Sequence, residues 1–144
     1  MAIKQISVFL ENKPGTLLKM TGVLAANNID MRALSLAETK DFGIVRMIVD
    51  DINTAATALK DADFINSMTD VVAVLIPDEP GGLDKVLQVL NEAKVNIEYM
   101  YAFLGSSGDD GAYMIFRVGD CKAAEEALRA RQIKVVTQEE IAEL

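Results

Sequence analysis

Apolar and polar residues follow two different spacings along the chain, one typical of strands and one typical of helices. Every second residue from Ile6 to Leu10 is apolar, which predicts a strand over residues 3–10. From Leu17 onward, apolar residues recur every three or four positions, which predicts a helix that ends near Asn27. The same patterns predict further strands at 29–36, 44–49, 64–68, 71–76, 97–104, 113–118 and 133–136, and further helices around 55–62, 83–90 and 124–128.

The order of these elements occurs twice. The sequence Pro-Gly-Thr-Leu at 14–17 recurs as Pro-Gly-Gly-Leu at 80–83, an offset of 66 residues, and later matches need an offset of 69. The three extra residues fall in the loop at 105–111, where an insertion costs little. We therefore divide the chain into two repeats, residues 1–70 and residues 71–144, of which the second ends in a short tail helix over 138–144.

Each repeat has the order βαββαβ, which predicts an α+β fold of two ferredoxin-like units. In such a unit, right-handed crossovers give a four-stranded antiparallel sheet with two helices on one face. The six residues from Val71 to Ile76 are all apolar, which indicates a strand covered on both faces. The helices of the repeat supply one cover. For the other we expect a second sheet from another chain, and hence a homodimer through the open sheet face.

Composition and charge exclude several classes of function. Of 144 residues, 51% are hydrophobic and 25% are charged, a balance typical of a globular protein, and the net charge of −8 disfavours nucleic-acid binding. There is no histidine, which excludes serine and cysteine triads with histidine and His-ligated metal sites. We expect no cofactor. With one cysteine, no signal-peptide pattern and no apolar run of about 20 residues, we expect a cytoplasmic protein without a membrane partner.

Two candidate functions have little support in the residues. The segment 111–116 has the aromatic residues Tyr113 and Phe116 in the manner of an RNA-recognition strand, but packing explains them better in so acidic a chain. An enzyme would need converging groups, and the neighbours Asp50 and Asp51 would point to opposite faces of a strand. Cys121 lies at the start of a helix, where a thiol pKa can fall, but it has no histidine to act as its base.

The two joints between a strand and a glycine-led helix are better candidates for a site. One joint is at 11–17 and the other at 78–83. Free backbone N–H groups and the positive end of the helix dipole meet at such a joint, which suits a carboxylate, while Glu11, Asn12 or Asp78 could accept from an ammonium group. This combination predicts a free α-amino acid as ligand. A Pro-Gly turn before a helix is also common without any ligand, so both interpretations stay open.

At these residues the chain resembles the ACT domains, with two in tandem over nearly all of its length. The resemblance rests on the first joint, the helix after it, and the strand starts at 29–31 and 95–97. It implies that domains pair side by side, strand two against strand two, in an eight-stranded sheet, with an amino acid bound where the Pro-Gly loop of one domain meets strand two of its neighbour. The ligand-binding residues that it implies are Glu11, Asn12, Lys13, Pro14, Gly15, Thr16 and Leu17 facing Asn96 and Ile97, and Asp78, Gly81, Gly82 and Leu83 facing Asp30 and Met31.

The two implied sites are not equivalent. Asp78 stands where the first loop has Asn12, and Asp30 stands where the second repeat has Asn96. The second site would bring two carboxylates together, which repel, so we expect one good site per chain. The resemblance implies a non-catalytic amino-acid-binding regulatory protein, with a metabolic enzyme as a further partner. The alternative is a structural or regulatory subunit that docks on an enzyme and binds no small ligand.

Overall fold

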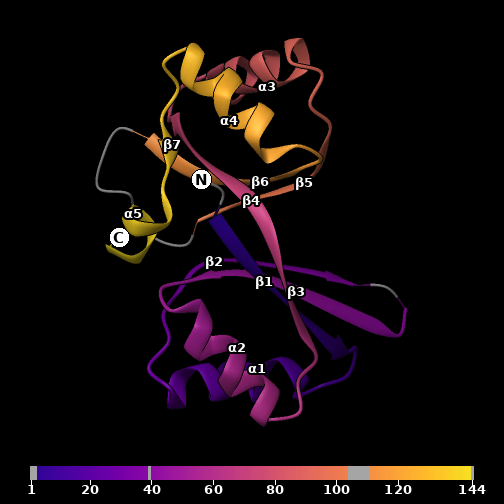
Figure 1. Ribbon diagram of the computed structural model, residues 1–144. Helices are drawn as coiled ribbons and strands as arrows, with labels where there is room; N and C mark the ends of the chain where they lie inside the picture. Colours follow the sequence, from indigo (N-terminus) through magenta and orange to yellow (C-terminus); the bar gives the residue numbers. More distant parts are fainter. Residues whose placement is uncertain (1–2, 39, 104–110, 144) are drawn as a thin grey trace.

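A computed structural model of the protein describes residues 3–38, 40–103 and 111–143. It confirms the predicted α+β fold with two βαββαβ repeats (Figure 1). Residues 104 and 144, the predicted ends of a strand and of the tail helix, lie outside the described residues, as does the loop at 105–110. The elements are β1 (Ile3–Glu11), α1 (Thr16–Ala26), β2 (Met31–Glu38), β3 (Phe42–Val49), α2 (Ile52–Asp61), β4 (Asn66–Pro77), α3 (Gly82–Glu92), β5 (Ile97–Ala102), β6 (Gly111–Val118), α4 (Cys121–Ala130), β7 (Val135–Val136) and α5 (Gln138–Glu143).

One long strand, β4, belongs to both repeats. The sequence predicts two strands at 64–68 and 71–76, but the chain stays extended between them because β1 pairs with residues 66–71 and β6 pairs with residues 72–77, without a gap. The first half of β4 pairs with β1, and the second half pairs with β6 and β7. The predicted boundary between residues 70 and 71 therefore falls inside this strand.

The sheet curls so that its two halves face each other. The strand order is β2-β3-β1-β4-β6-β5, with β7 on the second half of β4, and the pairs are antiparallel. The second strands of the two repeats, β2 and β5, meet at one bridge between Ala33 and Phe103. Instead of the eight strands implied by the resemblance, the described residues form seven, because β4 serves both repeats.

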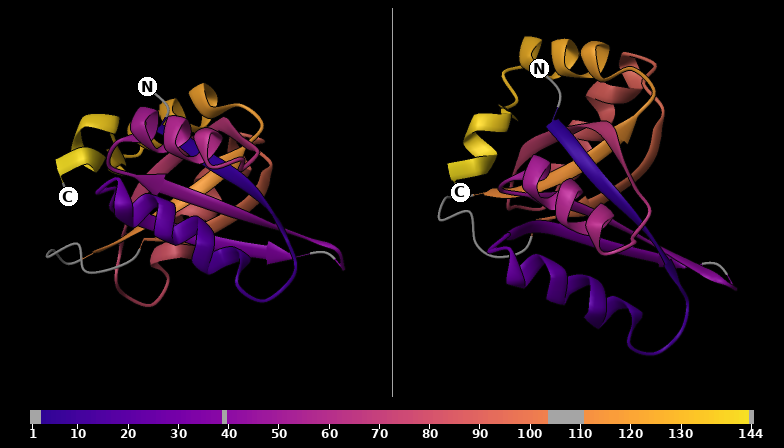
Figure 2. Two further views of the ribbon diagram at one scale, coloured as in Figure 1. Left: turned by 90° about the horizontal axis from the view of Figure 1, so that it is seen from below. Right: turned by 60° about the horizontal axis from the view of Figure 1, so that its bottom comes forward.

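Two helix pairs cover the outer faces of the curled sheet. In Figure 1, α1 and α2 lie below the strands and α3 and α4 lie above them, while α5 lies to one side, as it does in Figure 2. In β1 the even-numbered residues Ile6, Val8 and Leu10 point to the first helix pair, as the alternation predicts. In β4, Val72 and Val74 pack against the second pair.

The inner faces of the two sheet halves pack on each other, and we call the buried apolar residues between them the seam. The seam consists of Ile3, Ala33, Ile48, Val71, Ala73, Tyr101, Ile115, Val136 and Ile141. Val71 and Ala73 explain the continuous apolar run of β4, since they alternate with residues that face the helices. The expectation that another chain covers this face is therefore wrong, because the second repeat of the same chain covers it.

A buried polar network crosses the seam. Gln5 is fully buried on β1, and its side-chain amide donates to the Tyr99 hydroxyl at 2.8 Å and to Ser7 Oγ at 3.2 Å. The Tyr101 hydroxyl donates to Gln5 Oε1 at 2.6 Å. Burial raises the pKa of Tyr101, so this hydroxyl stays a donor. The Arg46 guanidinium lies 3.9 Å from the centre of the Tyr99 ring, and the network thereby ties the two repeats together.

Candidate ligand-binding site

The four long helices begin in two different ways. Asp51 caps α2 by accepting from the Thr54 amide at 3.1 Å, and Asp120 caps α4 by accepting from the Ala123 amide at 3.0 Å. By contrast, α1 follows Gly15 and α3 follows Gly81, both with left-handed φ values of 90° and 84°. No side chain of a described residue caps either of these two helices. The first amide of each helix donates to a backbone carbonyl, Thr16 to Lys13 at 3.5 Å and Gly82 to Glu79 at 3.0 Å, so the amides of the next residues in each first turn are the ones available to an anion.

A solvent-open pocket of about 650 Å³ adjoins the start of α1. Five predicted site residues line it: Glu11, Lys13, Pro14, Gly15 and Thr16. The remaining lining residues were not predicted from the sequence, because they come together only when the ends of β1 and β3 approach the segment before β4. They are Phe9, Leu10, Lys19, Phe42, Asp63, Phe64 and Ile65.

Polar contacts hold the turn before α1 in shape. The Thr16 hydroxyl donates to the carbonyl oxygens of Glu11 at 2.8 Å and Lys13 at 3.0 Å, so it closes the turn. Lys13 Nζ lies 3.0 Å from a carboxylate oxygen of Glu11, an exposed ion pair of small energetic weight. The backbone N–H of Asn12 donates to the Asp41 carbonyl at 3.1 Å. The turn is thus fixed before any ligand arrives.

The other residues predicted for the first site do not line this pocket. Leu17 is half-buried and packs against the core beneath α1. Asn96 is exposed just before β5, and Ile97 packs against the core beneath α3 and α4. The pocket is therefore built from residues of the first repeat. That Asn96 and Ile97 face this pocket and contact the ligand stays a prediction.

The second helix entrance is tighter than the first. Gly82, the counterpart of Thr16, is buried, and a Cβ added to it would lie only 2.2 Å from the Pro77 carbonyl oxygen. Only glycine fits at this approach of helix to strand. The predicted site residues Asp78, Gly81 and Leu83 are exposed around it.

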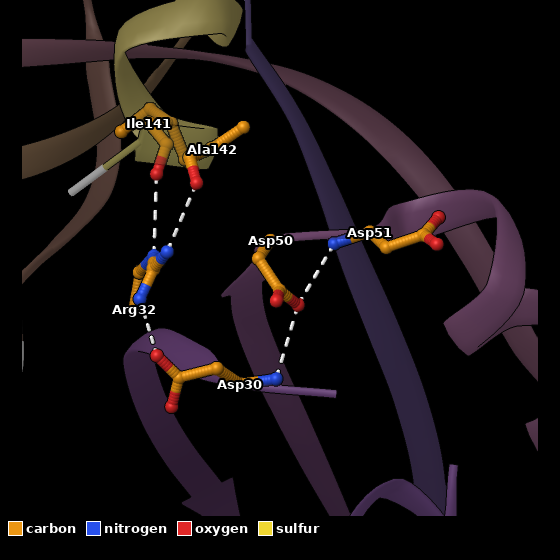
Figure 3. Close-up of polar contacts among 6 residues, drawn as sticks. All are labelled: Asp30, Arg32, Asp50, Asp51, Ile141 and Ala142. Atoms are coloured by element: carbon orange, nitrogen blue, oxygen red, sulfur yellow. Dashed lines mark hydrogen bonds and ion pairs between the residues drawn. The ribbon is translucent and has the colours of Figure 1, made fainter. Parts of the chain in front are cut away.

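At the start of β2, charged groups are already paired (Figure 3). The Asp30 carboxylate forms an ion pair with Arg32, while Met31 packs half-buried against the first core. Asp50 Oδ1 accepts from the amides of Asp30 at 3.0 Å and Asp51 at 2.9 Å, which fixes the strand start. Arg32 was not predicted as a partner of Asp30, although its place two residues after Asp30 at a strand puts both on one face.

Three residues considered for catalysis or RNA binding have structural partners. Cys121 Sγ donates to the Asp70 carbonyl at 3.5 Å, and burial raises the pKa of this thiol, which reduces its thiolate fraction. Phe116 is 1% exposed, and the Tyr113 ring packs against Phe103 at a centroid distance of 5.2 Å. These aromatic residues therefore serve packing.

No helix within the described ranges has the length and apolar character to cross a bilayer.

Comparisons with known proteins agree with this architecture. The family model described as "ACT domain pair" matches residues 1–144. The chain belongs to the ACT domain pair family. Its structure resembles the crystal structure of a protein from Bacteroides thetaiotaomicron, with 41% identity and a TM-score of 0.93 over 100% of this chain and 98% of that one. A search of the curated proteins found no match.

Two solved structures of lower identity share the fold. The regulatory subunit of aspartate kinase from Thermus thermophilus, in its ligand-free form, is 20% identical with a TM-score of 0.66, and the match covers 92% of each chain. The corresponding subunit from Thermus flavus is 16% identical with a TM-score of 0.60, over 90% of this chain and 92% of that one. At these identities the likeness shows the fold alone.

Proposed function

We propose that this chain is a non-catalytic regulatory protein that binds a free α-amino acid at the entrance of α1. The observation that carries the proposal is the contrast among helix starts. Within the described residues, α2 and α4 are capped by their own aspartates, whereas α1 and α3, at matching places in the two repeats, begin at uncapped glycines. An incoming carboxylate would serve α1 as Asp51 serves α2.

The pocket beside α1 has groups for each end of a zwitterion. The amides of Leu17 and Leu18 lie in the first turn, before the first intrahelical bond from Lys19 to Gly15, and suit the carboxylate. Lys19 lines the same pocket and adds positive charge. Glu11, which also lines it, offers a carboxylate for the ammonium group.

Apolar side chains on the pocket wall favour an amino acid with an apolar or aromatic side chain. Phe9 is 44% exposed, Phe42 is 60% exposed and Ile65 is 72% exposed, and all three line the pocket. A ligand side chain that covers part of this surface would gain about 25 cal/mol per Å² of apolar area removed from water. An amino acid with a polar side chain would not gain this free energy of binding.

The proposal extends to assembly and regulation. Asn96 and Ile97, which the family resemblance assigns to the first site, do not line the pocket, so a second copy of the chain is our candidate for bringing them there. The protein would then act as a homodimer whose ligand shifts the equilibrium between open and closed pairings. Because structures with a similar fold include regulatory subunits of aspartate kinase, we propose a metabolic enzyme as the regulated partner.

A thermal-shift screen of the twenty amino acids tests the proposed ligand. At about 100 times its Kd, a ligand adds about 2.7 kcal/mol to the free energy of unfolding. With about 2.1 cal/mol/K of unfolding entropy per residue, that raises the Tm of a chain this long by about 9 °C. A flat response to every amino acid at millimolar concentration would remove the proposal.

Two matched variants locate the response on α1. Gly15→Asp places a carboxylate of the chain's own beside the amides of Leu17 and Leu18, at a left-handed φ of 90° that strains an aspartate, and should abolish the rise in Tm. Gly22→Asp adds the same charge to the same helix, at an exposed position with no atom within 4 Å of the new Cβ, and should keep it. Equal responses from the two variants would place the ligand elsewhere.

The exposed apolar wall also favours a second candidate function, a subunit that docks on an enzyme without a small ligand. Phe9, Phe42 and Ile65 would then contact the enzyme directly. If the protein captures an enzyme equally well with and without amino acids, and the thermal-shift screen is flat, this alternative is favoured.

A further inference from the structure

Arg32 holds the C-terminal end of the tail helix α5 with one edge of its guanidinium group. Its Nε donates to the Ile141 carbonyl oxygen at 3.2 Å, and its Nη2 donates to the Ala142 carbonyl oxygen at 3.0 Å (Figure 3). Its Nη1 forms the ion pair with Asp30. The Arg32 side chain is only 17% exposed in this arrangement.

The two carbonyl oxygens stand in for a carboxylate. The Nε and Nη2 atoms of an arginine form the edge that binds both oxygens of a carboxylate through parallel hydrogen bonds. Here the two acceptors are backbone oxygens at the C-terminal end of α5, which carries a partial negative charge. Asp30 already pairs with Nη1, but the Nε and Nη2 edge is satisfied only by peptide dipoles, where a carboxylate would bind more strongly.

The tail helix depends on its contacts for its stability. With six residues it is too short to be stable alone in water. Besides Arg32, it is held by Gln138, whose Oε1 accepts from the Lys4 amide at 3.1 Å, and by Ile141, which is fully buried in the seam. Because α5 has six residues and only one of them, Ile141, is buried, it can open locally while the paired strands of the sheet stay folded.

We propose that α5 is a latch, and that a small carboxylate, including that of a free amino acid, competes with it for the Nε and Nη2 edge of Arg32. In the latched state the tail occupies the edge. When the tail leaves, the edge becomes a binding site for a carboxylate, beside the ion pair with Asp30. Binding there keeps the tail released and uncovers the part of the seam around Ile141.

Hydrogen exchange of the tail tests the latch in the full chain. Arg32→Gln removes the charge and the bidentate edge, and each charge-assisted bond lost should speed opening by about tenfold. We expect exchange of the α5 amides to rise about tenfold to hundredfold relative to the amides of β3. Arg32→Lys keeps the charge without the edge and should give an intermediate rise.

A matched control separates the latch from a general loss of stability. Arg117, on β6, also donates to a backbone carbonyl, but its acceptor is Asp70 of β4 at 2.9 Å and not a carbonyl of α5. Arg117→Gln should leave the ratio of α5 exchange to β3 exchange unchanged. An unchanged ratio in Arg32→Gln would overturn the proposal, even if both sets of amides exchange faster.

Acetate tests the competition directly. A competitor that binds only the open tail raises α5 exchange by a factor of about 1 + [L]/Kd, whatever the strength of the latch. We expect at least a twofold rise in 300 mM sodium acetate against sodium chloride of equal ionic strength, and no rise in Arg32→Gln. Equal exchange of the wild type in the two salts would refute the competition.

The same exchange experiment with single amino acids distinguishes the two proposals of ligand binding. A rise in α5 exchange that Arg32→Gln abolishes supports the latch. A rise in Tm that Gly15→Asp abolishes, with α5 exchange unchanged by either acetate or amino acid, supports the α1 entrance and overturns the latch. The two outcomes depend on different residues and different measurements.

Discussion

Tyr101→Phe tests whether the polar network holds the two repeats together. Tyr101 is 8% exposed, and its hydroxyl donates to Gln5 Oε1 at 2.6 Å across the seam. The substitution removes the donor but leaves a buried acceptor, and an unsatisfied buried polar group costs about 1–3 kcal/mol. For a chain of 144 residues this loss lowers the Tm by about 3–10 °C.

Urea unfolding of a double-mutant cycle measures the effect. Gln5→Leu combined with Tyr101→Phe removes both partners, so the double variant should be more stable than the sum of the single losses predicts, by about 0.5–3 kcal/mol. Tyr113→Phe keeps a ring that is half-buried at the rim of the seam and should cost less than about 0.5 kcal/mol. A loss below about 0.5 kcal/mol for Tyr101→Phe, with no coupling to Gln5, would refute the account of the network.

Two glycine substitutions should change the free energy of unfolding, measured in urea, in opposite directions. Low pH should reduce the protection of the α5 amides from hydrogen exchange. Gly82→Ala places a methyl group 2.2 Å from the Pro77 carbonyl oxygen and should lower the free energy of unfolding by about 1–3 kcal/mol or more. Gly22→Ala, in open space within α1, should raise it by about 0.5–1 kcal/mol, and the reverse order would contradict the geometry. The hydrogen bond from Lys134 lowers the pKa of Glu140, so the contribution of Glu140 to α5 is complete above its unfolded-state pKa of about 4.3 and is lost as the pH falls through the lower folded-state pKa. Protection factors of α5 amides should therefore fall as the pH drops below about 4, and constant protection from pH 6 to pH 3 would contradict this assignment.

Much of the fold can be predicted from local sequence patterns. The alternation in β1 and the repeated Pro-Gly joint predict two βαββαβ units, because each signal is contained in a short run of consecutive residues. The packing of the two halves of the curled sheet on each other is not predictable from such local patterns. Gln5 and Tyr101 are 96 positions apart, and no spacing rule connects them. The apolar run from Val71 to Ile76 correctly indicates cover on both faces but cannot say which chain supplies it.

In the candidate site, too, some features can be predicted from local sequence and others depend on tertiary structure. The starts of α1 and α3 are uncapped because glycine, which has no side chain, stands at the N-cap position. In α2 and α4 the same position holds Asp51 and Asp120, which cap their helices. The apolar wall of the pocket does not follow, because Phe9 and Ile65 come from segments more than 50 residues apart in the sequence. The docking of α5 on Arg32 likewise depends on tertiary placement, since the two are more than 100 residues apart.

Backbone amide shifts during titration with an amino acid test the central claim most directly. The titrant is the amino acid that raises Tm most in the screen, and nitrogen-15 spectra follow every amide of the chain. Binding of its carboxylate at the entrance of α1 predicts that the amides of Leu17 and Leu18 shift most, and that Gly15→Asp suppresses these shifts. Shifts centred on any other part of the protein, with Leu17 and Leu18 unmoved at saturation, would contradict the account.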